Sequence, residues 1–112
     1  MVAPPAFCVA LCTMPDAASA ENMARHLTEL KLVACTNLVP HLTSIYMWEG
    51  KITQGTELLL VMKTRQDKLV DLEKAIAQIH PYKVFEFIAL PIIYGNSKYL
   101  GWIDEVVAAP SP

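Results

Sequence analysis

The stretch Ser44-Ile45-Tyr46-Met47-Trp48-Glu49-Gly50-Lys51-Ile52 decides the fold of this chain. Successive side chains of a strand point to opposite faces, so the two-residue spacing places Tyr46 and Trp48 on the same face. Glu49-Gly50 then supplies a tight turn, because glycine readily adopts the positive φ that two-residue hairpin loops require. The stretch therefore predicts a β-hairpin whose second strand starts at Lys51-Ile52.

Strands and helices alternate on both sides of this hairpin. Asp16 is placed to cap a helix, and Thr64 with Asp67 has the spacing of a second cap. Pro40 is expected to interrupt a strand with a bulge or an edge break. His80-Pro81 is expected to end a helix, because proline cannot continue one. Hydrophobic periodicity predicts, in chain order, a strand over 7–13, a helix over 17–31, a strand over 33–39 that resumes over 42–48, a strand over 51–64, a helix ending at 79, a strand over 84–94 and a helix over 97–107.

The predicted order of elements is β-α-β-β-α-β with one further helix at the end. This is the ferredoxin-like pattern, an α+β two-layer sandwich in which a four-stranded antiparallel sheet carries its helices on one face. A chain of 112 residues fits one such domain. We therefore expect a single domain over residues 1–112, with frayed ends at 1–6 and 108–112.

The central strands are apolar on both faces, which a two-layer sandwich leaves unexplained. One face of an antiparallel sheet is normally solvated, so its strands alternate apolar with polar residues. Leu58–Met62 and Ile88–Ile93 do not alternate in this way, and 54% of the chain is hydrophobic. Two helices cover one face only, and another copy of the chain is the simplest cover for the other. The pattern predicts a homo-oligomer.

Composition and charge exclude several classes of partner. The net charge is −2, and the nine Lys and Arg residues are scattered singly, so the basic stripe of a nucleic-acid-binding protein is absent. No stretch approaches the ~18 consecutive apolar residues of a membrane span, so we expect no membrane insertion. Three cysteines make an odd count, and the N-terminus lacks a secretory pattern. Both features favour a reducing, cytoplasmic location.

Several stretches carry a specific family pattern: Leu32-Val33-Ala34-Cys35-Thr36-Asn37-Leu38-Val39-Pro40, Ser44-Ile45-Tyr46, Trp48-Glu49-Gly50-Lys51, Lys63-Thr64, His80-Pro81-Tyr82 and Ala89-Leu90-Pro91. Together they resemble the CutA family of divalent-cation tolerance proteins from about Val9 to Val107. The resemblance implies a ferredoxin-like fold, a homotrimer with inward-packed sheets and a non-enzymatic role in metal tolerance. Two positions depart from the pattern: Lys83, where relatives usually carry an acidic residue, and Phe85, where they usually carry a proline.

Cys35, His80 and Cys12 are the candidate metal ligands. A thiolate is a soft ligand suited to copper(I) or zinc, and His80 is the natural imidazole partner for Cys35. No Cys-x-x-Cys or His-x-x-x-His spacing supplies a local site, so ligands must meet across the fold or between subunits. The resemblance adds Cys12, because family members with a cysteine there are implicated in copper binding. The alternatives are core packing for the cysteines and, for His80, an imidazolium at a helix C-terminus.

A second group of residues has the composition of a ligand-binding cleft. Tyr46, Trp48 and Tyr82 supply aromatic surface, while Lys63 and Glu86 supply charge. The aromatic residues are equally typical of anchors in a protein–protein interface. Both interpretations hold if the cleft lies between subunits, where concave sites tend to form.

Different functions remain open at this stage. The first is a non-enzymatic homotrimer that binds copper or another divalent cation. The second is a small-molecule sensor similar in architecture to PII signalling trimers, with its ligand in intersubunit clefts. A thiol enzyme or hydrolase built on Cys35, His80 and Glu86 ranks last, because the sequence contains no catalytic motif. A rigid scaffold for other proteins is a further possibility.

Overall fold

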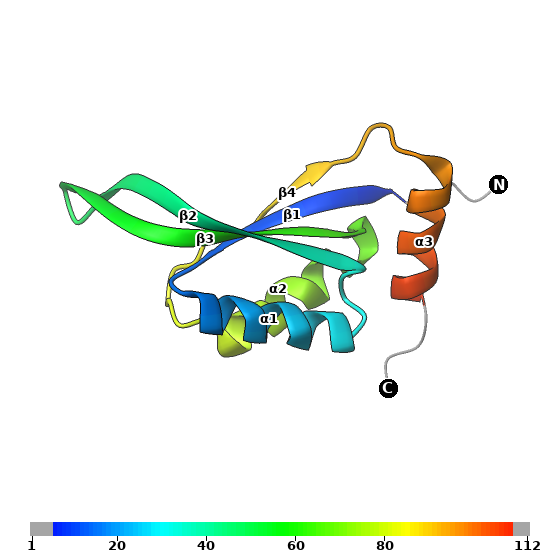
Figure 1. Cartoon of the computed structure of the whole chain (residues 1–112), viewed down its shortest axis with the longest axis horizontal. Helices are drawn as coiled ribbons and strands as arrows, with labels where there is room; N and C mark the ends of the chain where they lie inside the picture. Colours follow the sequence, from blue (N-terminus) through cyan, green and yellow to red (C-terminus); the bar gives the residue numbers. More distant parts are fainter. Residues whose placement is uncertain (1–5, 109–112) are drawn as a thin grey trace.

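The computed structural model describes residues 6–108 and confirms the α+β ferredoxin-like architecture. One sheet contains four strands in the order β2-β3-β1-β4, and all neighbouring strands are antiparallel (Figure 1). The elements are β1 (Phe7–Met14), α1 (Ala17–Glu29), β2 (Cys35–Trp48), β3 (Lys51–Arg65), the short 3-10 helix η1 (Gln66–Lys68), α2 (Leu69–Ile79), β4 (Ile88–Pro91) and α3 (Ser97–Ala108).

The chain ends that we expected to be frayed lie almost entirely outside the described residues. At the N-terminal side, the Ala6 carbonyl accepts a hydrogen bond from the Gln66 amide at 2.8 Å. At the C-terminal side, Ala108 is the last residue of α3. The predicted fraying of 1–6 and 108–112 stays a prediction.

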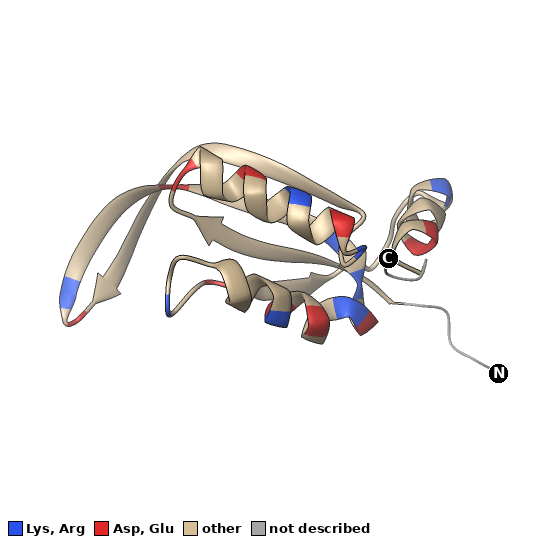
Figure 2. Ribbon diagram, turned by 90° about the horizontal axis from the view of Figure 1, so that it is seen from below, with Lys and Arg blue, Asp and Glu red and all other residues tan. Residues whose placement is uncertain are grey.

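Helices α1 and α2 lie side by side beneath the sheet and bury one of its faces (Figure 2). Along β1 every second side chain is buried, as expected for a strand with one face against a helical layer. The predicted cap of α1 is confirmed: the Asp16 carboxylate accepts a hydrogen bond from the Ser19 amide at 2.8 Å. The main core between the layers contains Ala10, Cys12, Met14, Ala20, Met23, Leu27, Val33, Leu60, Met62, Leu72, Ala75 and Ile76.

The β2–β3 hairpin is longer than the helical layer and projects beyond it (Figure 1). Its turn has the predicted form, with positive φ at both Glu49 (49°) and Gly50 (78°). The bulge predicted at Pro40 is also confirmed, since the pairing of β2 with β3 shifts register between Val39 and Leu42.

Two local predictions were wrong. Strand β4 spans only Ile88–Pro91, whereas the sequence predicted a strand over 84–94. Phe85 and Phe87, which precede β4 in the chain, pack against the main core. Residues 84–87 therefore connect α2 to the edge of the sheet without forming a regular ladder. The Thr64 hydroxyl caps no helix; it is buried and donates a hydrogen bond to the Leu32 carbonyl at 2.7 Å.

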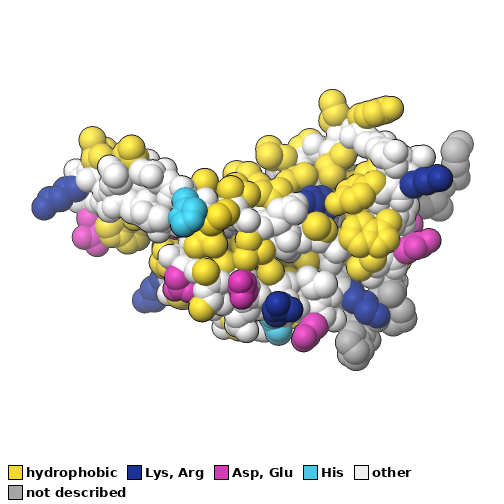
Figure 3. Space-filling view, in the orientation of Figure 1, with side chains coloured by type: hydrophobic (Ala, Val, Ile, Leu, Met, Phe, Trp, Pro, Cys, Tyr) yellow, Lys and Arg dark blue, Asp and Glu magenta, His cyan; other side chains and the backbone are white. Residues whose placement is uncertain are grey.

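The face of the sheet opposite α1 and α2, here called the open face, is apolar. Residues paired across an antiparallel ladder share a face, so strand register identifies its members. Figure 3 shows hydrophobic side chains gathered across the sheet. Ile88 and Leu90 are 52% and 51% exposed. The apolar residues of the open face are Val9, Leu11, Val39, Leu59, Val61, Ile88 and Leu90, and its polar residues include Thr13, Cys35, Asn37 and Lys63.

Helix α3 packs at one end of the sheet. Ile103 and Val107 are buried against Ala34 there, and Arg65 of β3 forms an ion pair with Asp104 at 2.6 Å. The rest of the open face has no helix over it within residues 6–108 (Figure 1). None of the helices in this range is both long and apolar enough to cross a membrane.

Candidate functional site

His80 fixes the chain where it leaves α2. Its Nδ1 accepts a hydrogen bond from the Tyr82 amide at 3.0 Å, so the ring proton lies on Nε2, which donates to the Thr13 carbonyl at 2.9 Å. The ring also stacks on Phe85, with centroids 4.9 Å apart. His80 therefore lies at the helix C-terminus as predicted, but it acts as a neutral clamp between β1 and residues 80–87.

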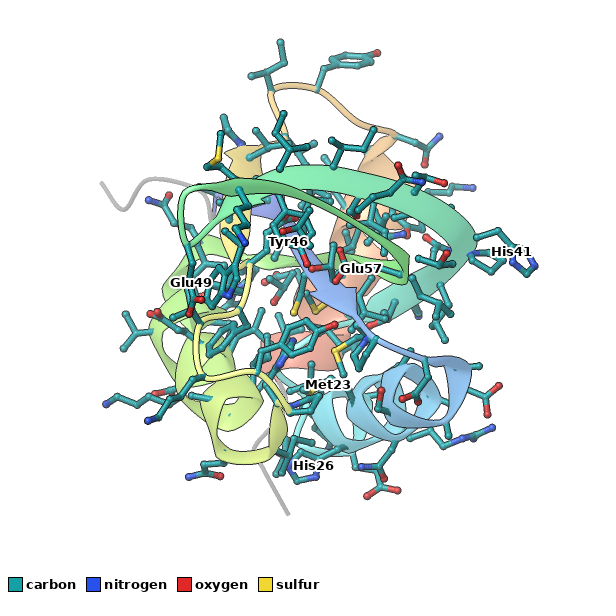
Figure 4. All side chains as sticks on the ribbon, turned by 90° about the vertical axis from the view of Figure 1, so that its left-hand side faces the viewer. Met23, His26, His41, Tyr46, Glu49 and Glu57 are labelled. Carbon is teal, nitrogen blue, oxygen red and sulfur yellow. The ribbon has the colours of Figure 1, made fainter. Side chains whose placement is uncertain are left out.

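This clamp shapes a cleft of about 740 Å³ between the β2–β3 hairpin and residues 80–87. The register of the hairpin places Tyr46 and Trp48 on the same side, together with Glu57 nearer its base. Figure 4 shows Tyr46 and Glu57 close together beneath the hairpin. The lining residues are Thr13, Ser44, Ile45, Tyr46, Trp48, Glu57, Pro81, Tyr82, Lys83, Val84 and Glu86.

Two carboxylates dominate the charge around the cleft. The Tyr82 hydroxyl donates a long hydrogen bond of 3.4 Å to Glu57, and burial followed by the nearby Glu57 charge raises the pKa of Tyr82. Burial, then Glu86 and Glu57, raises the pKa of the Cys12 thiol to about 12. Both carboxylates therefore raise the pKa of the same thiol, near the end of β1.

Four of the five predicted cleft residues meet in this cleft, namely Tyr46, Trp48, Tyr82 and Glu86. The fifth, Lys63, lies elsewhere: it pairs opposite Cys35 on the open face and its ammonium contacts the Asn37 side chain. Ten residues of β3 separate Lys63 from the partner of Tyr46, which is roughly 33 Å along a strand.

The sequence reasoning missed two charged residues of the cleft, Lys83 and Glu57. Glu57 is an isolated acid in a strand whose neighbours Leu58, Leu59 and Leu60 are apolar, and that isolation is a usable signal. Thr13 and Ser44 also line the cleft and were not proposed. Strand pairing places Ser44 at the cleft, and the bond to His80 places Thr13 there. Spacing along the sequence reveals neither contact.

The structure does not gather the three predicted metal ligands within one protomer. Cys35 lies opposite Lys63, whereas His80 is bonded to Thr13, which lies opposite Leu59. Four residues of β3, about 13 Å, separate these points. Among residues 6–108 no group of three or more His, Cys, Asp or Glu side chains is arranged to hold a metal ion.

The three candidate ligands differ in availability. Cys12 is fully buried in the main core, and both ring nitrogens of His80 are engaged in hydrogen bonds. Cys35 is half-buried on the open face beside Tyr99, whose pKa is raised by burial and then by the adjacent thiol. A site shared between copies stays a prediction, with Cys35 as its most accessible member.

The raised pKa of Cys12 gives a testable dependence of stability on pH. The thiol has a pKa of about 12 in the folded chain and an ordinary value of 9.0, so its contribution is complete below pH 9 and is lost as the pH rises toward 12. The free energy of unfolding is expected to fall by about 1.4 kcal/mol per pH unit in this window. Urea titrations of the native chain and of Cys12→Ala measure this, because other groups titrate in both. Parallel curves for the two proteins would contradict the assignment.

The architecture and the cleft define a class: a ferredoxin-like α+β domain with a long hairpin arm, an apolar open face and an aromatic, acidic cleft. The family described as CutA1 divalent ion tolerance protein matches residues 8–106. The chain belongs to this family.

Individual relatives agree with this membership. The divalent-cation tolerance protein CutA of Thermus thermophilus is 44% identical over 97 residues, which cover 87% of this chain and 94% of the relative. A CutA homolog of Xenopus laevis is 46% identical over 95 residues, which cover 85% of this chain and 63% of the relative. The chain thus spans only about three-fifths of the length of this and similar animal relatives.

Solved structures give the same result. The divalent cation tolerance protein of Thermus thermophilus superposes with a TM-score of 0.87 at 43% identity, covering 88% of this chain and 96% of that one. The CutA1 of Oryza sativa superposes with a TM-score of 0.89 at 39% identity, covering 91% and 94%.

Proposed function

We propose that the chain is a non-enzymatic homotrimer that binds copper or another divalent cation and acts in metal tolerance. Family membership supports the divalent-cation role, since the matching family and its relatives carry that description. The neutral clamp at His80 supports a non-enzymatic role, because both ring nitrogens are committed to backbone groups.

The apolar open face is the single observation that carries the assembly. Burying one Val, Leu or Ile side chain contributes about 1.5–3 kcal/mol, and the open face presents seven such residues. These residues are already partly buried, with Ile88, Leu90 and Val39 39–52% exposed and the other four less so, and each therefore contributes only part of this amount. Together they offset part of the estimated 4–15 kcal/mol that docking costs in lost freedom of motion. Contact between copies of the chain through the open face buries these apolar residues.

The metal assignment follows from the same face. Cys35 lies on it, so a neighbouring copy is able to supply the further ligands that one protomer lacks. A thiolate favours soft ions, and copper(I) in particular. All three cysteines are free, which supports a reducing, cytoplasmic location.

Copper(I) binding by the assembled protein is expected to weaken when Cys35 is replaced by Ala. Removal of a direct ligand should cost at least as much as loss of an outer partner, about 10–100-fold in affinity. Competition against a chromogenic copper(I) chelator measures affinity and stoichiometry. Cys8→Ala is the matched control, because Cys8 is buried. Unchanged affinity and stoichiometry in the Cys35 variant would remove this residue from the site.

A second function is favoured by the cleft itself. A concave site of about 740 Å³ with aromatic walls and few polar groups has the form of a small-molecule pocket. We therefore also propose that the chain senses a small molecule, in the manner of PII-like trimers that hold ligands near subunit boundaries.

A further inference from the structure

The cleft combines three aromatic rings with two carboxylates, Glu57 and Glu86. We propose that it binds an organic ammonium ion. This inference rests on the second function above, that the cleft holds a small molecule, and it names the chemical class of that molecule.

The size of the cleft requires an organic body. A volume of about 740 Å³ lies within the roughly 300–1,000 Å³ of pockets that enclose small organic ligands. A bare or hydrated metal ion fills only a small part of such a space. Apolar lining from Ile45, Val84 and Pro81 adds surface that a hydrated ion does not use.

The aromatic rings come from both walls. Tyr46 and Trp48 project from the same side of the hairpin, and Tyr82 belongs to the opposite segment, yet its hydroxyl reaches Glu57 on β3. Aromatic faces attract a positive charge through the ring quadrupole, and tryptophan does so most strongly. The same arrangement recurs where proteins recognise alkylammonium groups.

The net charge of the cleft lining is opposite in sign to that of an ammonium ion. Glu57 and Glu86 carry two negative charges and Lys83 carries one positive charge, which leaves the lining with one net negative charge. Glu57 is half-buried, whereas Lys83 is exposed and free to turn toward water. Only one Glu57 oxygen accepts the Tyr82 hydroxyl, so the other is available to a cationic ligand.

Metal coordination at this cleft is less well supported. No third His, Cys, Asp or Glu joins the two carboxylates in a metal-binding group among residues 6–108. A cation with an organic body uses the carboxylates, the rings and the apolar lining together.

Calorimetric titration of the assembled wild-type protein tests the proposal. The probes are choline, 1,4-diaminobutane and 3,3-dimethyl-1-butanol, which has the shape of choline without its charge. At least one of the two cations is expected to bind about tenfold or more tightly than the neutral alcohol. Glu57→Gln should remove most of that difference, Lys83→Gln should increase it, and Glu73→Gln on the exposed side of α2 should leave it unchanged.

Two results would overturn the proposal. One is equal binding, or no binding, of the cations and the neutral alcohol. The other is saturable binding of Mn²⁺ or Cu²⁺ that Glu57→Gln abolishes while the organic cations do not bind, which would make the cleft a metal site. The mass of the same samples, measured by sedimentation, separates these results from failure of the proposed assembly. An intact trimer that binds copper but no organic cation refutes only the present inference.

Discussion

Val61→Glu is expected to convert the assembled protein into folded single protomers. Val61 lies at the centre of the open face, between Leu11 of β1 and Asn37 of β2. Burial of an unpaired carboxylate in an apolar interface costs several kcal/mol for each copy. Sedimentation velocity should then give a species near the protomer mass of 12.4 kDa.

The matched control for this substitution is Val70→Glu. Val70 is 65% exposed on α2, away from the open face, so the same chemical change should leave the assembly intact. Far-UV circular dichroism verifies that each variant retains its secondary structure. If the Val61 variant keeps the wild-type mass while folded, copies do not meet through this face.

His80→Ala is expected to lower the free energy of unfolding by about 2–4 kcal/mol. Two hydrogen bonds and a stacking contact with Phe85 are lost, and the Thr13 carbonyl loses its side-chain donor. Residues 80–87, which carry Tyr82 and Glu86, also lose the anchor that holds them against the cleft. Urea unfolding monitored by far-UV circular dichroism gives the change.

Two further variants test whether the loss of stability comes from the contacts of His80. His26→Ala on α1 removes the same side chain from a helix surface and should cost less than about 1 kcal/mol. His80→Gln keeps an amide able to donate to Thr13, so it should recover part of the loss. A His80→Ala variant with wild-type stability but weakened copper binding would instead identify His80 as a metal ligand.

Local patterns predicted most of the fold. The Glu49-Gly50 turn, the Asp16 cap and the bulge at Pro40 each depend on residues within a few positions of one another. Short apolar runs and helical spacing placed the strands and helices, apart from the last long strand. That strand was predicted too long because Phe85 and Phe87 pack against the core where the chain passes from the helical layer to the edge of the sheet.

The candidate site was predictable only in part, since it depends on register and on one long-range clamp. Tyr46 and Trp48 could be paired from spacing alone. Lys63 was grouped with them for its charge, although it lies far along β3. Glu57 was missed, although the continuous register of the hairpin pairs it with Leu42 and so places it on the same side as Tyr46. The bond between His80 and Thr13 joins residues 67 positions apart, and no local pattern encodes it.

The central claim is that the apolar open face is covered by further copies of the chain. Sedimentation equilibrium of the wild-type protein, diluted through the micromolar range, tests it most directly. The predicted result is a constant mass of three times the protomer's 12.4 kDa. A stable, folded species of 12.4 kDa at these concentrations would contradict it.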